Sequence, residues 1–228
     1  MNTLLLRLSG AMQSWGVQSR FGMRDTGLEP SKSGALGLVC AALGIDRADD
    51  ESLAPLAALK MGVRVDREGV LKVDYHTAGE SGYLRAGNDV ERKNVILSNR
   101  YYLADALFLV GLAGNDLVLL ERIHTALRNP VWPLFLGRKA FVPGELLWLE
   151  DGLKPGKTLV DALKEFHSLS ARPAPERLRL VLEDQQDGSV VRSDQPLSFA
   201  QGNRRFAPRR LTVVFMPAPV PLSLTEVA

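Results

Sequence analysis

The order of its apolar segments limits the fold of this chain more than any other feature of the sequence. Residues 3–8 form a short apolar run that is typical of a buried strand. Residues 33–43 read as an apolar helix that begins at Ser31 or Ser33. Residues 49–59 have the pattern of a second, short helix. The chain therefore starts with a strand followed by helical crossover segments.

The next segments complete an alternation of strands and helices. Residues 61–66 and 70–75 alternate between apolar and polar side chains, like the strands of a hairpin closed around Glu68-Gly69. A strand pattern over 101–112, an amphipathic helix over 117–127 and a last strand over 146–149 follow. Strand, helix, hairpin, helix, strand is the βαββαβ order of the ferredoxin-like fold. The sequence thus predicts an α+β domain over residues 1–150.

Two long polar segments interrupt this pattern. Residues 10–31 form a loop that contains Gly16, Gly22 and Gly27, between the first strand and the first helix. Residues 76–99 are polar, of mixed charge and without a periodic apolar face, and they leave the sheet between its second and third strands. Long loops in a compact domain are usually functional or disordered. Both segments are therefore candidates for contacts with a partner.

The segment from 151 to 228 predicts a smaller, β-rich C-terminal part. Residues 158–166 have the pattern of a helix, and residues 178–183 and 211–215 have the pattern of strands. Residues 217–221 read as an extended tail because of their prolines. We expect the two parts to divide near residue 150.

Charge and cysteine content narrow the function classes only a little. A formal net charge of +2 does not by itself predict nucleic-acid binding, so any basic surface must come from clustering. Cys40, the single cysteine, cannot form an internal disulfide and has no zinc-ligand pattern around it. The first apolar run is too short for a signal peptide or a membrane span. We expect a cytoplasmic protein that needs no metal or other cofactor.

Four segments of the chain resemble a known family. They are LLLRLSGAMQSWG (residues 4–16), PSKSGALGLVCAALGI (residues 30–45), DYHT (residues 74–77) and PLFLGRKAF (residues 133–141). In this order they resemble the CasD-type subunits of type I-E CRISPR Cascade complexes, which belong to the RAMP superfamily. The matched blocks cover most of the first 141 residues, and the first two together are the most specific.

The resemblance implies a fold and a role. CasD-type subunits have a ferredoxin-like (RAMP/RRM-like) core with a protruding β-hairpin thumb, which we expect at about residues 76–99. They bind the 5′ handle of the crRNA, cap the filament of CasC-type backbone subunits and help to seat the CasA-type large subunit. They thereby take part in RNA-guided binding of target DNA. The resemblance also implies a non-catalytic subunit, since a separate CasE-type subunit cuts the precursor RNA.

Under this resemblance the first loop holds groups suited to single-stranded RNA. Gln13 is suited to a base edge and Trp15 to stacking, and Gly16 permits a close backbone approach. Arg20 and Arg24 are candidates for phosphate contacts. The alternative for Trp15 is that its ring folds back into the core.

The start of the first helix is a second candidate. Lys32, Ser33 and Gly34 stand where free backbone N–H groups and the helix dipole favour an anion, and we expect a phosphate there. The alternative is a capped helix whose lysine is merely solvated.

The remaining candidates lie further along the chain. In the predicted thumb the basic side chains are Arg85, Arg92, Lys93 and Arg100. Tyr75 and His76 precede the thumb, and Arg138 and Lys139 follow the apolar residues 131–136. Arg204, Arg205, Arg209 and Arg210 form the densest basic cluster, although the resemblance does not place it on RNA.

Two other function classes remain open. Metal-independent RNA cleavage needs a base and a cation near the 2′-hydroxyl and the phosphate, which Lys72, Tyr75 and His76 could supply. In a strand, however, Tyr75 points away from the other two side chains. A plain assembly protein would instead use residues 131–136 and 217–221 for protein contacts alone.

Overall fold

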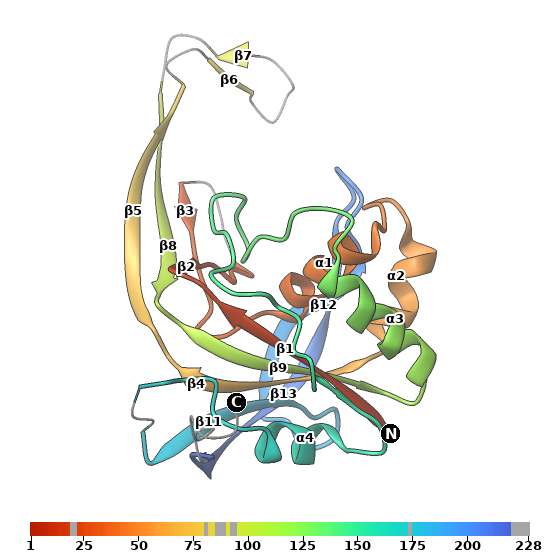
Figure 1. Cartoon of the computed structure of the whole chain (residues 1–228). Coiled ribbons are helices and arrows are strands. Elements are labelled where there is room, and N and C mark those ends of the chain that lie inside the picture. The colour runs from red at the N-terminus through yellow and green to blue at the C-terminus, as the bar shows by residue number, and fades with distance from the viewer. Residues whose placement is uncertain (19–21, 80–81, 85–89, 92–94, 173–174, 220–228) are drawn as a thin grey trace.

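A seven-stranded antiparallel sheet in the order β10-β1-β9-β4-β11-β13-β12 forms the centre of the computed structural model (Figure 1). The structure describes residues 1–18, 22–79, 82–84, 90–91, 95–172 and 175–219. The sheet strands are β1 (Asn2–Ser9), β4 (Lys60–Arg67), β9 (Leu107–Gly114), β10 (Leu153–Lys154), β11 (Arg177–Glu183), β12 (Val190–Ser198) and β13 (Arg205–Pro217). The expected mixed α+β class is confirmed.

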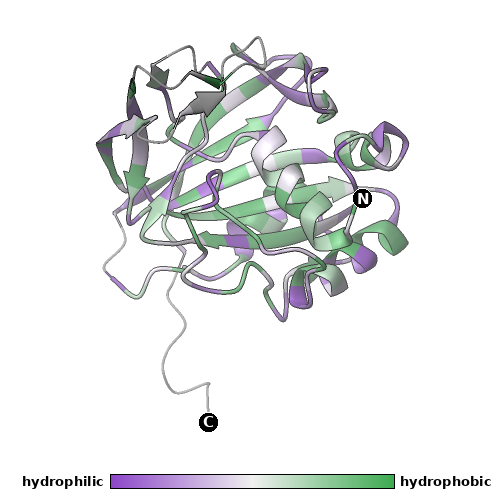
Figure 2. Ribbon diagram, turned by 90° about the horizontal axis from the view of Figure 1, so that it is seen from above, coloured by the Kyte–Doolittle hydropathy of each residue, from purple (hydrophilic) through white to green (hydrophobic). Residues whose placement is uncertain are grey.

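Helices cover both faces of the large sheet in the described part of the chain. The helices are α1 (Lys32–Leu43), α2 (Asp50–Ala57), α3 (Leu117–Arg128) and α4 (Leu159–Glu165). Helices α1, α2 and α3 share one apolar core with alternate residues of β1, β4 and β9, and α4 shares a second core with the opposite face. Predominantly apolar strands beneath these helices are visible in Figure 2.

The expected single strand over residues 101–112 is wrong, because the chain there forms two strands in different sheets. Strand β8 (Ile96–Ala104) ends before Asp105, whose φ of 58° is in the left-handed region, and β9 then enters the large sheet. Arg67 donates to the carbonyl oxygen of Asp105 at 2.5 Å, and Arg172 donates to its carboxylate at 2.7 Å. These contacts fix a break at the one charged residue of an otherwise apolar run.

The expected hairpin of residues 61–66 and 70–75 is also wrong. Strand β4 pairs with β9 and β11, whereas β5 (Val70–Ala78) pairs with β8 along its whole length. Between them Gly69 has a φ of +74°, and a Cβ there would lie 2.8 Å from the carbonyl oxygen of Ala104. The alternation of apolar and polar residues therefore located both strands correctly, but it did not reveal which strands they pair with.

Strands β5 and β8 form an arm that projects away from the large sheet (Figure 1). Strand β2 (Met12–Gln13) pairs antiparallel and β3 (Met23–Arg24) pairs parallel with the other edge of β8. At the far end, β6 (Tyr83–Leu84) pairs with β7 (Val90–Glu91). The base of the arm is thus a four-stranded sheet that includes the loop after β1.

The C-terminal segment extends the large sheet. Strands β11, β13 and β12 follow β4 in the sheet order, and β12 was not among the predicted strands. The expected last strand over 146–149 is wrong, since β10 supplies the pairing to β1. The carbonyl oxygen of Leu147 nevertheless accepts a hydrogen bond from the Arg7 N–H at 2.9 Å. The division of the chain near residue 150 stays a prediction.

A fully buried ion pair within β4 also holds the end of α4. Arg64 and Asp66 have no exposed side-chain surface, and the Arg64 Nε lies 2.6 Å from Asp66 Oδ1. The Arg64 guanidinium also donates to the carbonyl oxygens of Leu163, Phe166 and His167. One side chain therefore satisfies the carbonyls that the end of the helix leaves unpaired.

No helix among the described residues is long and apolar enough to span a membrane. Within the same residues, no group of three or more histidine, cysteine, aspartate or glutamate side chains could hold a metal ion.

Candidate nucleic-acid interface

Three arginines from separate segments meet at the base of the arm. Arg24 lies on β3 directly opposite Arg100 on β8 in the parallel register. Arg138, from the segment after α3, donates to the carbonyl oxygen of Tyr101 at 2.8 Å and to that of Arg24 at 3.4 Å. We call Arg24, Arg100 and Arg138 the arginine cluster. Arg24 and Arg138 were predicted RNA contacts and Arg100 was a predicted thumb cation, and the fold brings them together.

A close approach of two backbones holds Arg138 in place. The Ser14 N–H donates to the carbonyl oxygen of Leu136 at 3.0 Å, and the Leu136 side chain is fully buried. Gly137 follows with a φ of +94°, and a Cβ there would lie 1.8 Å from the carbonyl oxygen of Ser14. Only glycine permits this packing. The segment that contains Arg138 is therefore fixed against the loop after β1.

The electrostatics of the cluster favour a bound anion. Burial and the charges of Arg100 and Arg24 lower the pKa of the Arg138 guanidinium, while Asp74 and Asp25 act in the opposite direction. Asp74 lies opposite Arg100 in the β5–β8 register. Arg24 is exposed and Arg100 is half-buried, so both are accessible from solvent. A phosphate would relieve the repulsion among three neighbouring cations.

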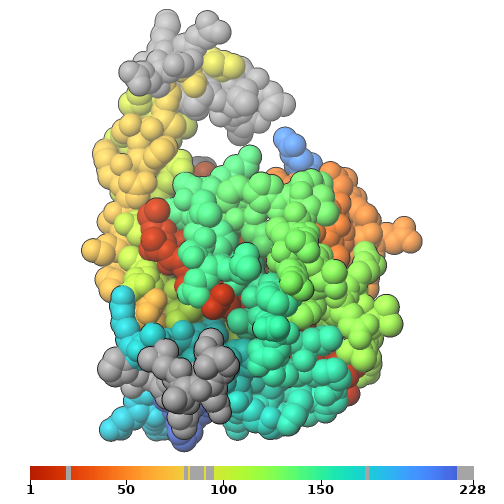
Figure 3. All heavy atoms as spheres, in the orientation of Figure 1, coloured from red at the N-terminus to blue at the C-terminus, as the bar shows by residue number. Residues whose placement is uncertain are grey.

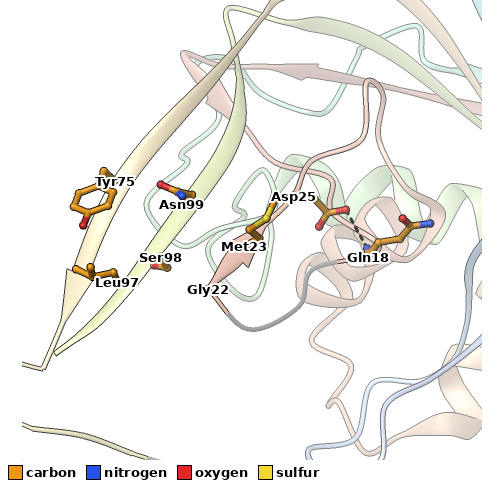
Figure 4. A pocket seen from close by; sticks show the side chains of 8 residues that line it. All are labelled: Gln18, Gly22, Met23, Asp25, Tyr75, Leu97, Ser98 and Asn99. Carbon is orange, nitrogen blue, oxygen red and sulfur yellow. Dashed lines mark hydrogen bonds between the residues drawn. The ribbon is translucent and has the colours of Figure 1, made fainter. Parts of the chain in front are cut away.

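An open hollow of about 710 Å³ lies beside the cluster, between the loop after β1 and the arm (Figure 4). Its lining residues are Gln18, Gly22, Met23, Asp25, Tyr75, Leu97, Ser98 and Asn99. The Tyr75 side chain is 64% exposed, which leaves its ring free for stacking. Gln18 and Asn99 add exposed amides that are able to read base edges. The hollow thus combines an apolar wall with polar groups.

Sequence reasoning did not identify Gln18 or Asn99 as site residues. Their position depends on the parallel pairing of β3 with β8, which places Met23 opposite Asn99. A two-residue strand gives no periodic signal, so the sequence offered no means of finding this side of the site.

The predicted base contact by Gln13 is corrected by the structure. Its side chain is fully buried and donates to the carbonyl oxygens of Leu8 and Ala106 at 3.2 and 2.8 Å. Its amide oxygen accepts from the Trp15 indole at 3.2 Å. Gln13 therefore holds the loop after β1 to the core.

The predicted stacking role of Trp15 is corrected in the same way. Its side chain is 2% exposed and belongs to the core under α1. A Cβ on Gly34 would lie 2.8 Å from the Trp15 ring, so this glycine leaves room for the indole. The core alternative for Trp15 is the one that the structure supports, and Gly34 serves packing.

The predicted phosphate site at the start of α1 is occupied by the chain itself. The Lys32 side chain is 1% exposed and its Nζ lies 2.9 Å from Glu183 Oε2. The Lys32 N–H donates to Asp194 Oδ2 at 2.8 Å, so a carboxylate already fills the anion position. The Ser33 hydroxyl lies 3.5 Å from that of Ser31. Burial lowers the pKa of the Lys32 amine, and the charge of Glu183 opposes that shift.

Replacing Lys32 by methionine is expected to separate stability from RNA binding. Breaking one partner of a buried ion pair costs about 3–5 kcal/mol of stability, because the remaining carboxylate stays buried. RNA affinity, measured by fluorescence anisotropy where the variant is folded, should stay within about twofold of the parent chain. A folded Lys32→Met variant that loses RNA binding would contradict the structural role of this lysine.

The other predicted contacts fall into two groups. Gly16 and Lys139 are exposed, and the His76 imidazole is 43% exposed with its Nδ1 at 3.9 Å from Asp74 Oδ2. Outside the described residues lie Arg20, Arg85, Arg92 and Lys93.

The catalytic alternative has a specific geometry on the arm. Lys72 and His76 face Tyr102 and Ser98 across the β5–β8 ladder, whereas Tyr75 faces Asn99 and so points to the opposite side. A base and an acid for RNA cleavage would have to come from one face. The face that holds Lys72 and His76 lacks the Tyr75 hydroxyl.

Comparisons with known proteins agree with one another. Residues 3–212 match the model of the family CRISPR-associated protein (Cas_Cas5). The CasD subunit of the CRISPR system Cascade from Escherichia coli (strain K12) is 35% identical over 148 residues, and the match spans 60% of this chain and 65% of that relative.

Two solved structures share the fold along almost the whole chain. A crystal structure of a Cas protein is 44% identical with a TM-score of 0.78, covering 97% of this chain and 98% of the other. A chain of a CRISPR RNA-guided surveillance complex is 38% identical with a TM-score of 0.78, covering 95% of this chain and 91% of the other.

Proposed function

This chain belongs to the Cas5 family of CRISPR-associated proteins, and we propose that it holds the 5′ handle of the guide RNA in a surveillance complex. The arginine cluster is the observation that carries this proposal. Three arginines from β3, β8 and the segment after α3 come together here, and the residues that precede Arg24 and Arg100 line an open hollow. Phosphate recognition by arginine next to exposed amides and an exposed ring is the usual chemistry of single-stranded RNA binding.

We interpret the fold as a ferredoxin-like core with a thumb. The order β10-β1-β9-β4, with α1 and α3 on the same face, is the order of a βαββαβ domain and supports this interpretation. The arm formed by β5 and β8 leaves this sheet between β4 and β9, where a thumb is expected. In this interpretation β11, β12 and β13 are the smaller C-terminal part.

The proposed partners follow from the relatives. The relative from E. coli is a subunit of Cascade, and one matching structure is a CRISPR RNA-guided surveillance complex. We therefore propose that CasC-type and CasA-type subunits are partners, and that target DNA is met only through the complex. Exposed apolar side chains outside the arm suit such contacts, namely Val131, Trp132, Val142 and Leu146. Such a complex would work in the cytoplasm.

Within this proposal the chain binds RNA without cutting it. Cleavage of RNA by its own 2′-hydroxyl needs a base and a charge-stabilising group aimed at one phosphate. The arginine cluster supplies cations, and His76 lies on the same face of the β5–β8 ladder as Arg100, with Asp74 as its near neighbour. The endoribonuclease alternative is therefore carried by His76 alone and is testable by its replacement.

Salt-dependent binding tests the proposal directly. The purified chain is titrated with fluorescent RNA that carries the repeat-derived 5′ handle, and with an RNA of the same length and scrambled handle. We expect tighter binding to the handle and an affinity that falls with salt by a slope of about −0.7 per phosphate contact. Equal affinity for both RNAs, or affinity independent of salt, would refute the proposal.

A further inference from the structure

The turn between β12 and β13 lies in the longest acid-free stretch of the chain. From Gln195 to Thr225 there is no aspartate or glutamate, and four arginines fall within residues 204–210. A stretch of this length without a compensating acid is unusual for a chain in which charged residues of both signs are nearly balanced.

The fold uses these four arginines in different ways. Arg209 is buried and its Nε lies 2.6 Å from Asp194 Oδ1, so it is structural. Arg210 donates to the carbonyl oxygen of Gly188 at 3.1 Å. Arg205 lies 3.4 Å from Asp50, and both side chains are exposed. Arg204 is exposed and makes no ion pair with any residue that the structure describes.

Aromatic and amide side chains lie on either side of Arg204 along the chain. The Phe206 side chain is 41% exposed on β13, and its ring centroid lies 6.3 Å from that of Phe199. Gln201 and Asn203 are exposed in the turn between them. An exposed ring on a supporting ring, with amides and a guanidinium close by, is the combination that binds bases and phosphates of single strands.

The position of the turn fits a second contact on the same ligand. Figure 1 shows the arm and the β12–β13 turn rising from the same side of the large sheet, with α1 and α2 beside the turn. In the space-filling view the turn is the blue projection at the upper right, and the arm stands at the upper left (Figure 3). The arm, which carries the arginine cluster at its base, and the turn are thus presented on one side of the sheet.

We propose that the β12–β13 turn, with Arg204 and Phe206 as its contacts, is a second binding site for single-stranded RNA. The inference rests on the proposed function, because it places the same RNA on both sites. Arg204 contacts a phosphate and Phe206 stacks on a base, while Arg205 is held partly by Asp50.

Three variants of the full chain test the proposal by titration with the handle RNA over a range of salt. Arg204→Gln should reduce the salt slope by about 0.7, and Phe206→Leu should weaken binding by at least about fivefold with the slope unchanged. Lys164→Gln is the matched control, since this exposed cation is on α4 at the opposite face of the sheet. It should change neither quantity.

The outcomes separate the two proposals. If the parent chain does not bind the handle RNA, the proposed function itself fails. If the parent binds and both turn variants bind equally well, only the second site is refuted. A photoreactive benzoyl-phenylalanine placed at position 206 should crosslink RNA in the assembled complex. Crosslinks to a protein subunit alone would identify the turn as a protein contact and overturn the proposal.

Discussion

Replacing Arg64 by alanine is expected to destabilise the chain by about 3–5 kcal/mol, the range for breaking one partner of a buried ion pair. The change leaves the Asp66 carboxylate buried and removes the donor for three carbonyl oxygens at the end of α4. Urea denaturation followed by tryptophan fluorescence measures the loss. Helix α4, which covers one face of the sheet, should become the least protected element.

Two further variants show whether the loss of stability depends on the buried position of Arg64 or on its positive charge. Arg47→Ala removes an exposed arginine and should change the free energy of unfolding by less than about 0.5 kcal/mol. Arg64→Lys keeps the charge but cannot reproduce the five-donor fork, so it should recover only part of the loss. Equal denaturation midpoints for Arg64→Ala and Arg47→Ala would contradict the role given to the buried pair.

The double variant Arg24→Gln, Arg100→Gln is expected to lose at least about a hundredfold in affinity for the handle RNA at low salt. Two charge-assisted contacts to phosphate are removed, and each is worth about tenfold or more. The salt slope should fall by about 1.4 at the same time, because each phosphate contact on a single strand contributes about 0.7. Both residues lie on short strand pairs at the base of the arm, so the fold should persist.

The control for this variant is again Lys164→Gln, which should bind like the parent chain. A double variant that is folded, by its circular dichroism and unfolding midpoint, and that still binds with the parent affinity would remove the arginine cluster from the interface.

The sequence predicts the helices and several strands of this fold well, because their apolar periodicity is strong. Helices α1 and α3 and strand β11 lie close to the expected bounds. The pairing of the strands was harder to predict. Strand β5 has the alternation of apolar and polar residues expected of a hairpin partner of β4, yet it pairs with β8. The end of β8 at Asp105 was also missed, because local sequence alone does not mark it. Its neighbours on both sides are apolar, and the ion pairs that fix it come from distant residues.

The candidate site shows the same limit. Arginines were found because their residue type points to phosphate wherever they are exposed. The buried positions of Gln13, Trp15 and Lys32 could not be read from composition, since their partners Ala106, Glu183 and Asp194 lie far along the chain. In the sequence, a polar residue next to the start of a helix has the same pattern whether its side chain contacts RNA or is buried against the core.

One measurement tests the central claim most directly. The purified chain is incubated in EDTA with labelled precursor RNA that contains the repeat, and the products are separated on native and denaturing gels. The proposed function predicts a shifted band on the native gel and intact RNA on the denaturing gel. Specific cleavage that disappears in His76→Ala would contradict it and make the chain a metal-independent endoribonuclease.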